Sequence, residues 1–278
     1  MKKEEKVVQK NRLTKPFLIA AAIISLTAGA KILYSNPTER NAKSYSITAG
    51  NKLDSELQKA IETPSLRQTY LDNLISSNNI PFSSGVIYDP DGRKMRDYYL
   101  KLLTSNEANP QEIQTAMESV EASINDQKNT IRTPTIIELN GTKIRAPIYL
   151  NEAFFSPQSS LLNSQDTKHI IEKHEGRHTE QAYSGLEKLG YMNEKTVISG
   201  MHNGKIDQRI ISPIMEIDAL GYEIKSIESK WSNPTEQCKR SILGEYRKNR
   251  ELLERILPHS SSLQKKLIEG VLEKNPKR

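Results

Sequence analysis

The chain has 278 residues, of which 36% are hydrophobic, and this suits one sizeable helical core better than a protein with many membrane spans. Its net charge of +6 does not indicate nucleic-acid binding, because residues 1–31 hold seven lysine and arginine side chains against two glutamates and the remainder is nearly neutral. The single cysteine, Cys238, excludes an internal disulfide, so burial, or burial together with a metal, must stabilise the fold.

The N-terminal segment predicts contact with a membrane. Residues 17–30 contain no charged side chain, and a basic stretch precedes them. This pattern is typical of a secretory signal, for which residues 28–30 (Ala-Gly-Ala) offer a cleavage site. Alternatively, residues 17–34 form an uncleaved signal anchor close to the minimum length of a span. Both interpretations assign residues 1–34 to membrane targeting. Because the basic end stays in the cytoplasm, both place the later residues outside it, either anchored or secreted after cleavage behind Ala30.

The next two regions are expected to be a stalk and the first part of the folded domain. Residues 35–52 are polar and form the expected stalk. Residues 53–130 show mainly helical apolar spacing, broken near Pro64, where a second helix is expected to begin. A Val-Ile-Tyr strand at 86–88 is expected before an Asp-Pro-Asp-Gly turn signal. The other helices expected in this region cover 94–103 and 110–127.

Residues 131–278 form the second expected part of the domain, which begins with a β-rich stretch from Thr133 to Leu150. Asn140-Gly141 separates two apolar runs in this stretch and is the strongest short signal for a β-hairpin. Pro134 and Pro147 are expected to keep these strands at the edge of a sheet, because proline lacks a backbone N–H. The fold class is therefore α+β and mainly helical, with further helices expected over 167–189, 207–230, 235–257 and 261–273.

The strongest functional signal lies on the helix expected over 167–189. His174 and His178 are four residues apart, which on an α-helix brings both imidazoles to one face. Two imidazole nitrogens can then bind one cation, and Glu175 is placed to take a proton from a water held by that cation. Imidazole and carboxylate ligands suit zinc. His169 is expected at the surface, since five residues of α-helix rotate it about 140° away from His174.

A zinc site needs a third protein ligand. The three-histidine pattern of the metzincins is excluded, because Gln181 and Ser184 stand where it requires glycine and histidine. A carboxylate from a later helix is then the expected ligand. Glu216 is the preferred candidate, with Asp218 and Glu223 as rivals. Glu216 and Glu223 share one helix face, and Asp218 points about 200° away from Glu216.

With this pattern the chain resembles the zincin metallopeptidases, and within them the gluzincin branch. The resemblance covers residues 133–231 and is specific only at its motifs. Leu220 departs from the thermolysin-like pattern, which has an aspartate there, and this leaves the partner of the histidines unassigned. The residues that carry the resemblance are His174, Glu175, His178, Glu216 and Ala219.

The resemblance implies a zincin-like domain in which His174, His178 and Glu216 bind Zn2+ and Glu175 is the general base. A hairpin or small sheet would lie beside the metal-binding helix and align peptide or protein substrates. The implied activity is that of a zinc metalloendopeptidase. The alternative is a catalytically inactive zincin-like domain, or a helical binding module tethered to the membrane. The substrate and the oligomeric state stay open, as does the donor to the oxyanion, for which the candidates are Tyr183, Tyr222, Tyr246, His202 and Arg177.

Overall fold

The computed structural model describes most of the chain from Lys52 to Lys277. The ranges described are 52–78, 85–105, 108, 110–125, 131–132, 137–139, 142–144, 147–156, 163–181 and 190–277. The predicted membrane segment over 1–34, and the predicted stalk apart from its last residue, lie outside these ranges. Among the described residues, no helix combines the length and apolar character that crossing a bilayer requires.

The first part of the described chain is helical, as the sequence predicts. Helix α2 (Lys52–Glu62) and helix α3 (Arg67–Asn78) are separated by a short 3₁₀ helix, η3 (Pro64–Leu66). The predicted break at Pro64 is confirmed, and the proline occupies a first-turn position that needs no N–H donor. Strand β1 (Val86–Tyr88) follows, and then helices α4 (Arg93–Ser105) and α5 (Pro110–Asn125). The carboxylate of Asp89 fixes the start of α4 by accepting from the backbone N–H groups of Lys94 and Met95.

The strands form two small sheets rather than one hairpin. Strands β3 (Ile137–Leu139) and β4 (Thr142–Ile144) pair antiparallel across positions 140–141, which confirms the predicted hairpin. Strand β5 (Ile148–Leu150) belongs to the other sheet, between β1 and β2 (Ile131–Arg132). It runs parallel to β1 and antiparallel to β2.

The expectation that Pro147 keeps its strand at a sheet edge is wrong. Pro147 directly precedes β5, which is the central strand of its sheet. The missing N–H costs nothing there, because pairing begins at the next residue, where the N–H of Ile148 donates to the carbonyl of Gly85.

The second part of the chain is almost entirely helical. After a 3₁₀ turn, η4 (Glu152–Phe155), helix α6 (Ser164–His169) leads into a π-helical turn, η5 (Ile170–Glu175), and residues 176–181 continue as α-helix. Residues 182–189 of the predicted helix lie outside the described ranges. Helix α8 (Glu194–His202) was not predicted. The remaining elements match the predicted helices closely and are η6 (Gln208–Ile210), α9 (Ile211–Glu228), α10 (Glu236–Ile256), η7 (Leu257–His259) and α11 (Ser262–Lys274).

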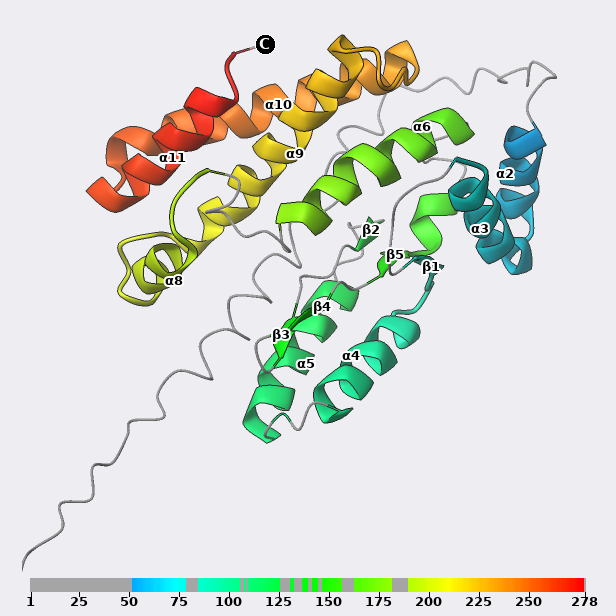
Figure 1. Cartoon of the computed structure of the whole chain (residues 1–278), viewed down its shortest axis with the longest axis horizontal. Coiled ribbons are helices and arrows are strands. Elements are labelled where there is room, and N and C mark those ends of the chain that lie inside the picture. The colour runs from blue at the N-terminus through cyan, green and yellow to red at the C-terminus, as the bar shows by residue number, and fades with distance from the viewer. Residues whose placement is uncertain are drawn as a thin grey trace, which may run out of the picture.

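Helix α9 is the central helix of this second part. It lies between the segment labelled α6 on one side and helices α10 and α11 on the other (Figure 1). Thirteen of the eighteen residues of α9 are buried, which is typical of a helix that is surrounded by others. Three of these buried residues are carboxylates, and buried charges require partners. They are Glu216, Asp218 and Glu223.

Candidate metal centre

His174, Glu175 and His178 lie on one helical segment that contains a change of pitch. The side chain of Asn163 starts this segment by accepting from the backbone N–H of Asp166. Between Ile170 and Glu175 the helix widens into the π-turn, and the N–H of Gly176 bonds to the carbonyl of Ile171, five residues back. Single π-turns of this kind are often found at functional sites.

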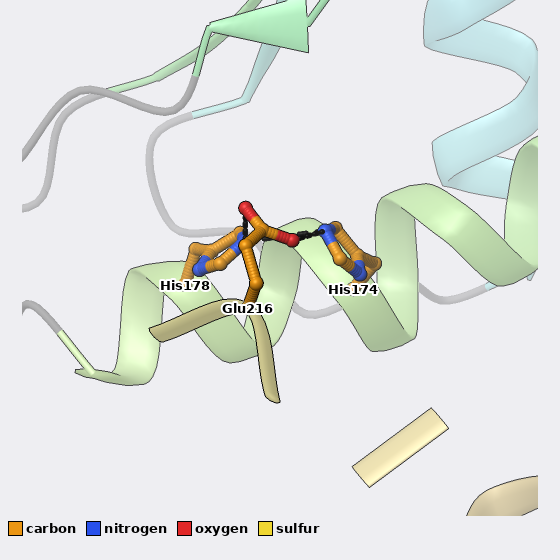
Figure 2. Close-up of side chains that lie close together, drawn as sticks. All are labelled: His174, His178 and Glu216. Atoms are coloured by element: carbon orange, nitrogen blue, oxygen red, sulfur yellow. Dashed lines mark hydrogen bonds and ion pairs between the residues drawn. The ribbon is translucent and has the colours of Figure 1, made fainter. Parts of the chain in front are cut away.

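Three side chains from this segment and from α9 converge in the protein interior. The Nε2 atoms of His174 and His178 are 3.1 Å apart. One carboxylate oxygen of Glu216 lies 3.5 Å from Nε2 of His174, and the other lies 3.4 Å from Nε2 of His178. Figure 2 shows the carboxylate between the two rings, with one oxygen directed toward each. Within the described part of the chain, this is the group whose nitrogen and oxygen atoms are close enough together to hold a metal ion.

The distances between these atoms fit one zinc ion. Zinc binds imidazole nitrogen at about 2.0–2.1 Å and carboxylate oxygen at about 2.0–2.2 Å, so two ligands of a tetrahedral ion lie about 3.3–3.5 Å apart. The three observed separations of 3.1, 3.4 and 3.5 Å lie in or close to this range. Neither oxygen of Glu216 accepts a hydrogen bond from the described residues, although both are buried. A metal ion would satisfy both of them.

Gln181 determines which nitrogen of His178 carries the proton. The amide NH2 of Gln181 donates to the carbonyl of Met215 at 2.8 Å and to the carboxylate of Asp218 at 2.9 Å. Both of these partners can only accept, so the amide orientation is fixed, and its oxygen faces Nδ1 of His178 at 2.7 Å. Nδ1 must therefore donate, which leaves the Nε2 lone pair of the neutral ring directed into the site.

Glu223 fixes the tautomer of His174 in the same way, but with a charged carboxylate in place of the neutral amide of Gln181. One of its carboxylate oxygens lies 2.9 Å from Nδ1 of His174, and a carboxylate can only accept. The Nε2 lone pair of the neutral His174 ring is therefore also directed into the site. When both rings are neutral, two nitrogen lone pairs and the carboxylate of Glu216 thus face one another. Such an arrangement requires a positive charge at its centre.

The pKa values of the two histidines reflect the negative charges of Glu216 and Glu223 beside them. Burial lowers the pKa of His174, but the charges of Glu223 and Glu216 outweigh it and raise this pKa well above its ordinary value. Burial also lowers the pKa of His178, and the charge of Glu216 again produces a net increase. Burial raises the pKa of Glu216, whereas the two imidazoles lower it to a net value of about 2. In the absence of a metal, protons therefore occupy the site, and a metal must displace them in order to bind.

The two rival carboxylates have other partners. Glu223 is engaged by Nδ1 of His174 rather than by Nε2. Asp218 accepts two hydrogen bonds from Arg177, at 2.7 and 3.1 Å, and further bonds from Gln181 and the hydroxyl of Tyr191. Although burial raises the pKa of Asp218, the bonds from Arg177 lower it overall. Of the three candidates on α9, Glu216 is therefore the carboxylate that faces both Nε2 atoms.

The expectation that His169 lies at the surface is wrong. Its side chain is buried, and its Nε2 atom lies 3.2 Å from the second carboxylate oxygen of Glu223. The prediction assumed α-helical pitch throughout, which would rotate His169 about 140° away from His174. The π-turn brings residues five apart onto one side of the helix, because its hydrogen bonds span five residues.

Glu175 lies at the end of the π-turn, directly after His174. It is buried, with a relative exposure of 1%, and its backbone carbonyl accepts from the hydroxyl of Thr179 at 3.0 Å. Its negative charge contributes to raising the pKa of His178, after the larger contributions of burial, Glu216 and His174. The carboxylate of Glu175 is therefore close enough to the site to influence its electrostatics.

Two of the candidate oxyanion donors have other partners. The guanidinium of Arg177 bonds to Asp218 and lies over the ring of Tyr222, 5.4 Å from its centroid. The hydroxyl of Tyr246 bonds to the carbonyl groups of residues 275 and 276 near the C-terminus. Tyr183 and the side chain of His202 lie outside what the structure describes. The donor is therefore not identified by these contacts.

Sequence reasoning missed Gln181 and Tyr191 as parts of this site. The i, i+3 spacing of His178 and Gln181 is itself a signal for contact on a helix. Tyr191 has no such signal, because it reaches Asp218 only through the tertiary fold. Comparison with known proteins adds no assignment: no family model, curated protein or solved structure matches the chain.

Proposed function

We propose that the protein is a zinc-dependent metallopeptidase with a zincin-like, gluzincin-type site. The observation that carries this proposal is the convergence of the Nε2 atoms of His174 and His178 with the carboxylate of Glu216, on the helical segment that also carries Glu175. The described residues supply three ligands, whereas structural zinc sites have four. A fourth position is then left for a water or a substrate, as in catalytic zinc sites.

The roles of the individual residues follow from their contacts. His174, His178 and Glu216 would hold the ion, and Glu223 and Gln181 keep the two imidazoles in the tautomers that binding needs. When bound, zinc supplies a Lewis acid and an acidic water. Glu175 would act as the general base, taking a proton from the attacking water and delivering it to the leaving amine.

We further propose that the enzyme acts outside the cytoplasm on peptides or proteins. This follows from the basic and apolar pattern of residues 1–34, which is typical of a signal anchor or a cleaved signal. The small sheet before the metal-binding helix, and the third ligand on the next long helix, agree with a zincin-like order of elements.

The proposal is tested by incubating the purified protein with a mixture of unstructured peptides and identifying the products by mass spectrometry. We expect internal cleavage that a zinc chelator abolishes and that added zinc restores. Cleavage that persists unchanged in the chelator would contradict the proposed chemistry.

One observation favours a second candidate function, a non-catalytic domain that uses the metal only for stability. The ligands are deeply buried: the relative exposure is 1% for His174, 7% for His178 and 5% for Glu216. A stabilising metal would need no path for a substrate. This function predicts zinc binding without any peptide cleavage, and a zinc-bound protein that hydrolyses peptides would rule it out.

A further inference from the structure

His169 and Glu223 form a buried polar pair behind the proposed metal ligands. Nε2 of His169 and the nearer oxygen of Glu223 are 3.2 Å apart, and both side chains are 1% exposed. Among the described residues neither atom has a partner in hydrogen-bond geometry, so the contact between them is an electrostatic one. This contact is what offsets the cost of burying both groups.

The contacts on either side of this pair determine which of its atoms donate and which accept. The hydroxyl of Ser232 contacts Nδ1 of His169, and the other oxygen of Glu223 accepts from Nδ1 of His174. A hydroxyl that donates to Nδ1 leaves the proton of His169 on Nε2, where it faces Glu223. The donations of His169 and His174 thus converge on the carboxylate of Glu223, with one donor facing each of its oxygens.

Ser232, the residue of this set that lies farthest from the metal ligands, belongs to the loop between α9 and α10. The backbone N–H groups of Trp231 and Ser232 both bond to the carbonyl of Ser226 at the end of α9. Three residues later, the N–H of Thr235 donates to the carboxylate of Asp166 on α6 at 2.7 Å. The loop is therefore tied to both helices, and the hydroxyl of Ser232 faces His169 from a fixed position.

We propose that His169 is a positioning residue for the metal centre, which acts by holding the Glu223 carboxylate against His174. The π-turn is the device that makes this possible, because it brings residues 169 and 174 to one side of the helix. The inference rests on the proposed function, since it assigns His169 a role toward the same metal. It assigns no direct contact with substrate or zinc.

Two substitutions of similar polarity separate the contacts of His169. In H169Q the amide nitrogen can stand where Nε2 stands and keep the contact with Glu223. In H169N the shorter amide can replace only Nδ1, so it keeps the contact with Ser232 and loses Glu223. A change of the exposed His259, H259N, is the matched control for loss of a histidine elsewhere in the chain.

The measurement is the zinc dissociation constant of the full-length protein, obtained by competition with a chromophoric chelator. We expect the zinc affinity of H169Q and H259N to be close to that of the wild type. For H169N we expect an affinity about tenfold weaker, which is the lower end of the range for removing a residue that supports a metal-ligating histidine. Equal affinities for H169Q and H169N would overturn the role of His169. A wild-type protein that binds no zinc would instead refute the proposed function.

A second variant keeps the inference testable if H169N does not fold. S232A removes only the outer hydroxyl, which lies on a loop and leaves the helix unchanged. We expect this variant to weaken zinc binding measurably and to alter the absorption spectrum of the cobalt-substituted protein, because His174 would be held less firmly. Wild-type affinity and an unchanged cobalt spectrum in folded S232A would count against this set of contacts.

Discussion

The carboxylate of Glu223 lies 2.9 Å from Nδ1 of His174, on the same helix that presents Glu216 to Nε2 of that ring. The two glutamates are seven residues apart, which is close to two turns, so both project from one face of α9. A single helix thus supplies a proposed ligand and the carboxylate that orients another ligand. The partner of His174, for which the sequence alone offered no assignment, is therefore Glu223.

We expect E223Q to weaken zinc binding by about 10- to 100-fold, as is usual when the partner of a ligating histidine is changed. The glutamine keeps the shape of the side chain but removes the charge that favours His174 as a ligand. The zinc dissociation constant, measured by chelator competition, tests this. E228Q, at the exposed end of the same helix, is the control. An affinity of E223Q equal to that of the control would contradict the role of Glu223.

We expect E175Q to keep its zinc and to lose peptide cleavage. Glutamine cannot accept the proton of the attacking water, and general-base catalysis is worth about 10²- to 10⁴-fold in rate. The measurements are kcat on a cleaved peptide and the zinc content of the same preparation. E180Q, on the following turn of the helix, serves as the control. Full activity in E175Q would remove Glu175 from the mechanism.

The stability of the first part of the domain depends on Arg67. This buried guanidinium donates to the carbonyl of Ala60 at 2.9 Å and contacts Tyr88 and Glu152, so it connects α2, α3, β1 and η4. It also lies over the ring of Phe155, 5.1 Å from its centroid. Because these contacts are lost together, we expect R67M to lower the free energy of unfolding by about 2–3 kcal/mol.

Urea denaturation measures this loss, and R93M is its control. The ion pair of Arg93 with Asp91 is exposed, and exposed pairs contribute about 0–1 kcal/mol.

The hydrogen bond from Arg67 is the main cause that lowers the pKa of Glu152. The stability from this contact is present above the ordinary pKa of glutamate and is lost as the pH falls through the lower pKa of the folded state. The difference between wild type and R67M should therefore shrink on acidification, and a difference that grows would contradict this account.

Local sequence patterns were sufficient for most helices and for the centre of the site. The apolar spacing and the proline positions located α2, α3, α9, α10 and α11, because these signals act within a few residues. The spacing of His174 and His178 similarly predicted that the two rings face each other. The choice of Glu216 over Asp218 was less direct, since it depends on which face of α9 meets the neighbouring helix.

Features that depend on long-range contacts or on an irregular pitch could not be predicted in this way. Strand β5 became a central strand because Ile148 pairs with Val86, far back in the sequence, and no local signal encodes that pairing. The π-turn was missed because periodicity analysis assumes regular helices. As a result, His169 was expected at the surface although it is buried beside Glu223.

The zinc content of the full-length protein, purified under metal-replete conditions without chelating tags, tests the central claim most directly. Elemental analysis should give about one zinc ion per chain for the wild type and far less for E216A, which lacks the third ligand. E228Q should match the wild type, because its changed residue lies at the exposed end of α9. A wild-type zinc content far below one per chain, or an E216A content equal to that of the wild type, would contradict the metal site described for His174, His178 and Glu216.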